Sequence, residues 1–122
     1  MRGRRRRRLH RSALASNDLL EKDFQAQVTE LAEILGWSWV HFRPLRTKHG
    51  WQTAVSGPLG EGWPDLFLAR DRDGRVMVLE LKKAGAKASP AQTDVMGYLE
   101  RAGMEGHFAW PDDFELVAGW LR

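Results

Sequence analysis

The chain of 122 residues is the size of one small domain, and its hydrophobic content of 43% argues against a wholly disordered protein. It contains no cysteine, which excludes disulfides and thiolate metal sites and fits a reducing compartment such as the bacterial cytoplasm. The net charge of +3 is unevenly spread: residues 1–16 carry seven arginines and no acid, whereas residues 17–122 carry twelve Lys and Arg against sixteen Asp and Glu.

The arginine-rich residues 1–16 are expected to form a disordered arm ahead of a folded domain at residues 17–122. An arginine block of this kind favours polyanions, nucleic acid first. A solubilising leader and a transit peptide are the alternative interpretations. Apolar runs stay short of the roughly 20 residues that a membrane span needs, so neither a membrane anchor nor secretion is expected.

The first predicted element is an amphipathic helix that starts at Asp18 and ends at Gly36. Asp18 precedes Glu21 by three positions, as in a capping box. Apolar residues recur at helical spacing, at Phe24, Val28, Leu31, Ala32 and Leu35. Residues 37–43 are aromatic and β-branched and predict a strand. Residues 44–63 predict a long, functional loop with a short strand near residues 52–55.

Two apolar strands follow at residues 65–70 and 75–82, joined by a polar turn. The run Ser89-Pro90-Ala91-Gln92 predicts a helix start, with Ser at the cap, Pro at the first position and Gln three after the cap. Residues 106–110 predict a strand, and a last helix starts at residues 111–113. The predicted fold is therefore α/β: a mixed β-sheet flanked by helices, in the order α-β-(β)-β-β-α-β-α.

The apolar hairpin carries three charges that need an explanation. Period two places Glu80 and Lys82 on one face of the second strand. A hairpin that turns at residues 71–74 pairs residues whose numbers sum to about 145, which puts Asp65 opposite Glu80. Two carboxylates side by side repel unless a cation lies between them.

Mg²⁺ would resolve this repulsion, because it takes few protein carboxylates and suits a phosphate substrate. The carbonyl of Leu81 could add an oxygen, and Lys82 could orient an attacking water. These groups suit phosphodiester hydrolysis. The structural alternative is that Asp65 caps a turn after Pro64 and that Glu80 and Lys82 are an exposed strand pair.

The run Gly62-Trp63-Pro64-Asp65, followed fifteen residues after Asp65 by Glu80-Leu81-Lys82, resembles the PD-(D/E)XK nuclease signature. More narrowly, the chain resembles the small stand-alone VRR-NUC domains of phages and prophages. The segments that carry this resemblance are EKDFQAQVTELAEILGW, GWPDLFLAR, VLELKK, SPAQ and AWPDDFELVAGWLR, which together span residues 21–122.

The resemblance implies a restriction-endonuclease-like fold and DNA cleavage that depends on Mg²⁺ or Mn²⁺. It implies that Asp65, Glu80 and the Leu81 carbonyl bind the metal and that Lys82 is catalytic. It also implies that Gln92 assists the site, although the sequence equally allows Gln92 to be only the capping partner of Ser89.

The family often adds a carboxylate from the first helix. Glu21 and Gln25 are the candidates here, one turn apart on one face. The family's long loop usually carries basic residues that bind substrate. The candidate DNA-binding residues, each of which could instead be a solvated surface residue, are His41, Arg43, Arg46, Lys48, His49, Lys83 and Lys87.

The expected function is a metal-dependent DNA endonuclease. The alternatives are a non-catalytic nucleic-acid-binding protein on the same fold, with the arm as its binding element, and a structural or assembly protein with a fortuitous motif. No recognition helix or zinc module is evident, so the sequence leaves open whether branched, flapped or junction DNA is cut. A homodimer would supply the two active sites that cutting both strands of a junction needs.

Overall fold

The computed structural model describes the backbone of residues 13–122 and the side chains from residue 22 onward. Residues 1–12, most of the predicted arm, lie outside the described residues. The first helix, α1, spans Ala13–Ile34 and so begins five residues before the start expected at Asp18. Alanine and leucine at residues 13–15 are strong helix formers, and they extend the helix beyond the capping pattern.

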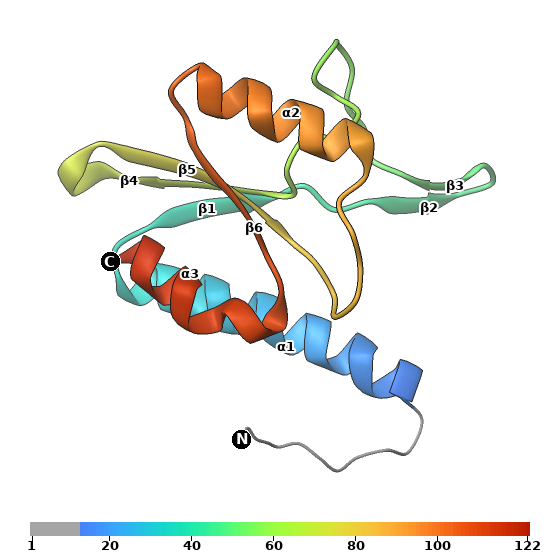
Figure 1. Cartoon of the computed structure of the whole chain (residues 1–122), viewed down its shortest axis with the longest axis horizontal. Coiled ribbons are helices and arrows are strands. Elements are labelled where there is room, and N and C mark those ends of the chain that lie inside the picture. The colour runs from blue at the N-terminus through green and yellow to red at the C-terminus, as the bar shows by residue number, and fades with distance from the viewer. Residues whose placement is uncertain (1–12) are drawn as a thin grey trace.

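A four-stranded mixed sheet forms the centre of the molecule, with the strand order β1-β4-β5-β6. The first three strands are antiparallel neighbours, whereas β5 and β6 are parallel. The helix α2 lies in the crossover between β5 and β6 and covers one face of the sheet, while α1 and α3 lie side by side on the other face (Figure 1). The predicted mixed α/β fold is confirmed. The bounds are Ser38–His41 for β1, Leu66–Arg70 for β4, Arg75–Leu81 for β5, Glu105–Ala109 for β6, Pro90–Arg101 for α2 and Phe114–Leu121 for α3.

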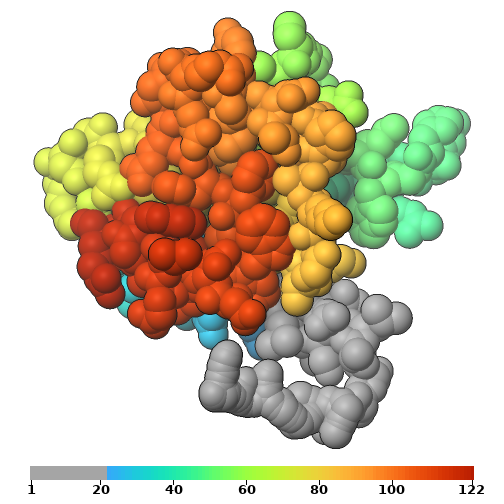
Figure 2. Space-filling view, viewed as in Figure 1, coloured from blue at the N-terminus to red at the C-terminus, as the bar shows by residue number. Residues whose placement is uncertain are grey.

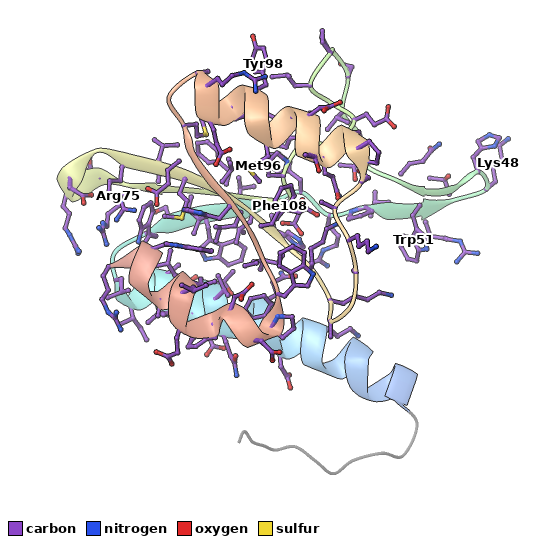
Figure 3. All side chains as sticks on the ribbon, viewed as in Figure 1. Lys48, Trp51, Arg75, Met96, Tyr98 and Phe108 are labelled. Carbon is purple, nitrogen blue, oxygen red and sulfur yellow. The ribbon has the colours of Figure 1, made fainter. Side chains whose placement is uncertain are left out.

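Helices bury both faces of β5, which decides the environment of the site. Met77 and Leu79 face the core shared with α1 and α3, as their alternation predicts. Val78 faces the other way and is buried against Met96 of α2, which Figure 3 shows between that helix and the sheet. Glu80 shares the face of Val78, so its carboxylate lies beneath α2 and not at an open sheet surface.

Residues 44–63 contain more regular structure than expected. The strands β2 (Leu45–Thr47) and β3 (Gly50–Gln52) pair as a separate two-stranded sheet. The short strand expected near residues 52–55 thus lies two residues earlier and has a partner strand. A turn at Lys48 and His49 joins the two, and the hydroxyl of Thr47 accepts a hydrogen bond from the His49 amide. This hairpin, the β2–β3 ribbon, projects beyond the central sheet (Figure 1).

The remaining elements close the fold around the sheet. Short 3₁₀ turns at Asp71–Asp73 and Pro111–Asp113 precede β5 and α3 respectively. Gly74 has a φ of 68°, the left-handed conformation that lets the chain enter β5 after the first of these turns. None of the helices within residues 13–122 combines the length and apolarity that a membrane crossing requires.

Candidate active site

The hairpin of β4 and β5 places Asp65 beside Glu80. Leu66 pairs with Leu79, which is the register that the hairpin arithmetic predicts. The Asp65 amide donates a hydrogen bond of 3.1 Å to Oε1 of Glu80, and the Leu81 amide donates one of 3.4 Å to Oδ1 of Asp65. Each carboxylate is therefore held by the backbone of the other strand.

Glu80 is a buried carboxylate, with only 7% of its surface exposed. Burial, followed by the charge of Asp65, raises the pKa of Glu80 to about 7 from an ordinary value near 4.5. The ammonium of Lys82 lies 3.7 Å from Oε2 of Glu80 and opposes this rise only in part. Ionisation of Glu80 beside Asp65 is therefore unfavourable, and Lys82 offsets that cost only in part.

Gln92 joins α2 to the two charged residues of β5. Its Oε1 accepts hydrogen bonds from Nζ of Lys82 at 2.6 Å and from the Ser89 amide at 2.9 Å. Its Nε2 donates to Oε2 of Glu80 at 3.2 Å. The capping box with Ser89 is also present, so the two contacts considered for Gln92 coexist. The cap fixes the backbone of the helix start, and this in turn aims the Gln92 amide at the site.

Gly62 allows the loop that precedes Asp65 to lie against the start of α2. Its φ is 95°, which favours glycine. A Cβ at this position would collide with the backbone carbonyl of Ala91 and would lie 2.9 Å from the Gln92 amide nitrogen. The absence of a side chain at Gly62 thus lets Asp65 and Gln92 approach the same point from different elements.

Gln25 of α1 is connected to Asp65 through His41. Nε2 of Gln25 lies 3.3 Å from Nδ1 of His41, and Nε2 of His41 lies 3.8 Å from Oδ2 of Asp65. The sequence marked His41 only as a basic loop candidate, because the pairing of β1 with β4 that brings it to Asp65 has no local sequence signal. Gln25 therefore faces the site, whereas the side chain of Glu21 lies outside the described residues.

A cleft of about 1100 Å³ opens beside these residues. Its lining includes Gln25, His41, Asp65, Glu80, Lys82 and Gln92, together with Leu81. Of the basic DNA-binding candidates, His41 and Lys83 line the cleft. The others are exposed residues outside its lining, namely Arg43, Arg46, Lys48, His49 and Lys87. The fold therefore gathers the acidic, lysine and glutamine candidates and leaves most of the basic ones outside the cleft.

The donor set at the cleft fits a hard divalent cation. Among the described residues, no three His, Cys, Asp or Glu side chains are placed to hold a metal ion together. A cation here would therefore rely on Asp65, Glu80, a backbone oxygen and water. Few carboxylates and several waters form the coordination that Mg²⁺ prefers.

The central hairpin of the mixed sheet presents an Asp, a Glu and a Lys at one end, in agreement with the PD-(D/E)XK signature that the sequence resembles. The family model of the VRR-NUC domain, a nuclease domain of that superfamily, matches residues 16–109. The chain belongs to the VRR-NUC family. Comparisons with curated proteins and with solved structures give no match.

Proposed function

We propose that this chain is a metal-dependent DNA endonuclease that hydrolyses phosphodiester bonds. The observation that carries the proposal is the convergence of Asp65, Glu80 and Lys82 on one wall of an open cleft, with Gln92 bonded to two of them. Membership in a nuclease family supports DNA as the substrate.

The residues that would hold Mg²⁺, or Mn²⁺ in its place, are Asp65 and Glu80, with the Leu81 carbonyl as a further oxygen. The support for this assignment is electrostatic, because a buried carboxylate beside a second one gains most from a nearby cation. When bound, a divalent cation lowers the pKa of a water molecule and offsets charge on the phosphate.

Lys82 supplies a positive charge at the cleft wall. Its ammonium donates one hydrogen bond to Gln92 and lies 3.7 Å from Oε2 of Glu80, so the protein fixes one of its three donors. The other two can hold a water molecule or a phosphate oxygen in the cleft. A preorganised cation of this kind stabilises charge that develops on the phosphate during hydrolysis. Gln92 is a positioning residue in this scheme, since it fixes both Lys82 and Glu80.

The preferred DNA is proposed to be branched, flapped or junction DNA. The cleft is lined mostly by loop residues and strand ends, and α1 and α2 each contribute a single residue to it, so recognition of DNA shape is more fitting than recognition of bases by a helix in the major groove. Cleavage of both strands of a junction would need two copies of the chain.

Cleavage assays on linear, flapped, forked and four-way DNA test the proposal. The wild type should cut with Mg²⁺ or Mn²⁺ and lose activity in EDTA. Asp65→Asn, Glu80→Gln and Lys82→Ala should each lower the rate at least about 100-fold. Lys22→Ala is the control, because Lys22 is an exposed lysine of α1 that lies outside the cleft lining and is not among the DNA-binding candidates.

Wild-type rates for Lys82→Ala would contradict the proposed role of this residue. DNA binding without cleavage under every metal condition would instead support the non-catalytic alternative. Circular dichroism of each variant should show an intact fold, so that a loss of rate can be assigned to the site.

A further inference from the structure

The β2–β3 ribbon exposes large apolar side chains. Trp51 is 67% exposed and Leu45 is 63% exposed, on a projecting element whose residues 45–52 are all exposed or half-buried. Figure 2 shows this ribbon standing out from the body of the molecule, and Figure 3 shows Trp51 and Lys48 on it. An exposed tryptophan on a projecting ribbon buries little apolar surface against the domain and so adds little to its stability. Its ring is instead available to a binding partner.

The positive charge of the ribbon indicates that its partner is negatively charged. Residues 43–52 contain Arg43, Arg46 and Lys48 and no acidic residue. Arg46 pairs with Trp51 in the ribbon, and its guanidinium lies 5.6 Å from the centre of the Trp51 ring. The pairing keeps the cation and the aromatic ring on one face. Cations beside an exposed aromatic ring form the kind of surface on which nucleic-acid bases stack while the phosphates are neutralised.

The ribbon is continuous with the cleft. Phe42 and Pro44, just before β2, line the cleft, and so do Gln52 and Thr53 at the end of β3. Both ends of the ribbon are therefore part of the cleft wall. Trp51 lies one residue from this wall, or about 3.3 Å along the strand. A DNA strand that leaves the cleft on this side meets the aromatic face within a short distance.

We propose that the Arg46–Trp51 face of the β2–β3 ribbon stacks on an unpaired base beside the cleaved strand. It would thereby favour DNA with single-stranded nucleotides at the branch over continuous duplex. In a continuous duplex the base faces are covered by their neighbours, and extruding one base costs a few kcal/mol. At a flap or a fork the nucleotides next to the branch are already unpaired, so this cost does not arise. This inference rests on the proposed function for its choice of DNA as the substrate.

Binding of intact protein to matched DNAs tests the inference. All variants carry Lys82→Ala, so that cleavage does not interfere, and affinity is compared for a flapped DNA and a blunt duplex. Trp51→Ala should weaken binding to the flap about tenfold and change binding to the duplex less than about twofold. Trp51→Phe should restore most of the loss. Tyr98→Ala is the control, because Tyr98 is a 54% exposed aromatic on α2, away from the ribbon (Figure 3).

A second measurement uses the unaltered ribbon. A 2-aminopurine base at the unpaired position next to the branch should lose fluorescence on binding if it stacks on Trp51, and a paired 2-aminopurine in the duplex should not. This readout, together with Trp51→Phe, decides the inference even if Trp51→Ala fails to fold.

Equal losses on flap and duplex, or no loss on either, would overturn the inference. Conversion of a dimer to a monomer by Trp51→Ala would also overturn it, because a second copy of the chain would then cover this face. A wild type that cleaves no DNA with Mg²⁺ or Mn²⁺ removes the proposed function, while the binding comparison still decides the role of Trp51.

Discussion

The backbone amide of Asp65 donates a 3.1 Å hydrogen bond to Oε1 of Glu80 across β4 and β5. The two carboxylate residues of the candidate site are thus linked directly, one position beyond Leu66 and Leu79, the last pair of the β4–β5 ladder. A slip of one residue in this hairpin would turn Glu80 to the opposite face of β5, away from α2. The apolar residues of the hairpin therefore fix the geometry of the site as well as the core.

Gln92 and Ser89 offer a way to separate positioning of the site from capping of α2. Gln92→Ala should lower the cleavage rate about 10- to 100-fold, because Lys82 and Glu80 lose their common partner. Ser89→Ala removes only the hydroxyl that accepts from the Gln92 amide, while the residue 89 amide still donates to Oε1 of Gln92; it should cost about 1 kcal/mol of stability with a rate near that of the wild type. Urea unfolding measures the stability of the two variants, and cleavage rates at saturating DNA measure their activity. A rate loss in Ser89→Ala as large as that in Gln92→Ala would contradict a direct role for the Gln92 side chain.

Glu80 should make the metal-free protein less stable as the pH rises. Burial raises the pKa of Glu80 to about 7 in the folded protein, above its ordinary value near 4.5. The unfolded chain therefore releases this proton at a lower pH than the folded protein, and stability falls between about pH 4.5 and 7. The loss amounts to at most about 3 kcal/mol.

Glu80→Gln removes this titration while it keeps the shape of the side chain. In EDTA, Glu80→Gln should gain stability relative to the wild type as the pH rises, and the difference should level off above about pH 7. Urea unfolding from pH 4.5 to 8 measures it. A difference between the two proteins that does not change with pH would contradict the raised pKa.

Mg²⁺ should stabilise the folded protein in a way that depends on Asp65. A cation that binds only the folded state at 100 times its dissociation constant adds about 2.7 kcal/mol. The gain should grow as the pH rises through 7, because Glu80 must lose its proton before it can coordinate. Thermal unfolding with and without Mg²⁺ measures the gain, and Asp65→Asn is expected to reduce it. An equal gain in Asp65→Asn would place the cation elsewhere.

Alanine substitutions at Gly62 and Gly85 distinguish the cost of backbone strain from the cost of a steric collision near the site. Both have positive φ values, 95° and 80°, but an added Cβ meets Ala91 at Gly62 and open space at Gly85. Gly85→Ala should therefore cost about 1–2 kcal/mol from strain alone. Gly62→Ala should cost about 1–3 kcal/mol more and should also lower cleavage, since Gln92 has to move. If Gly62→Ala and Gly85→Ala lost equal stability in urea unfolding, the start of α2 would have to shift away from the added Cβ without any loss of stability.

The sequence by itself determined the local parts of the site. Alternating apolar residues and a polar turn set the register of β4 and β5, and the register predicted Asp65 beside Glu80. Ser89-Pro90-Ala91-Gln92 predicted the start of α2, because capping depends on residues close together in the chain. The same motifs carried the resemblance to the VRR-NUC family, which the family match shows independently.

Only the tertiary structure decided which distant elements meet at the hairpin. The pairing of β1 with β4 brings His41 and Gln25 toward Asp65, and the position of α2 over Val78 buries Glu80. The pairing of β2 with β3 turns an expected loop into a projecting ribbon. Contacts of this kind depend on which faces pack together over long separations, and a local pattern of apolar and polar residues carries no information about that choice.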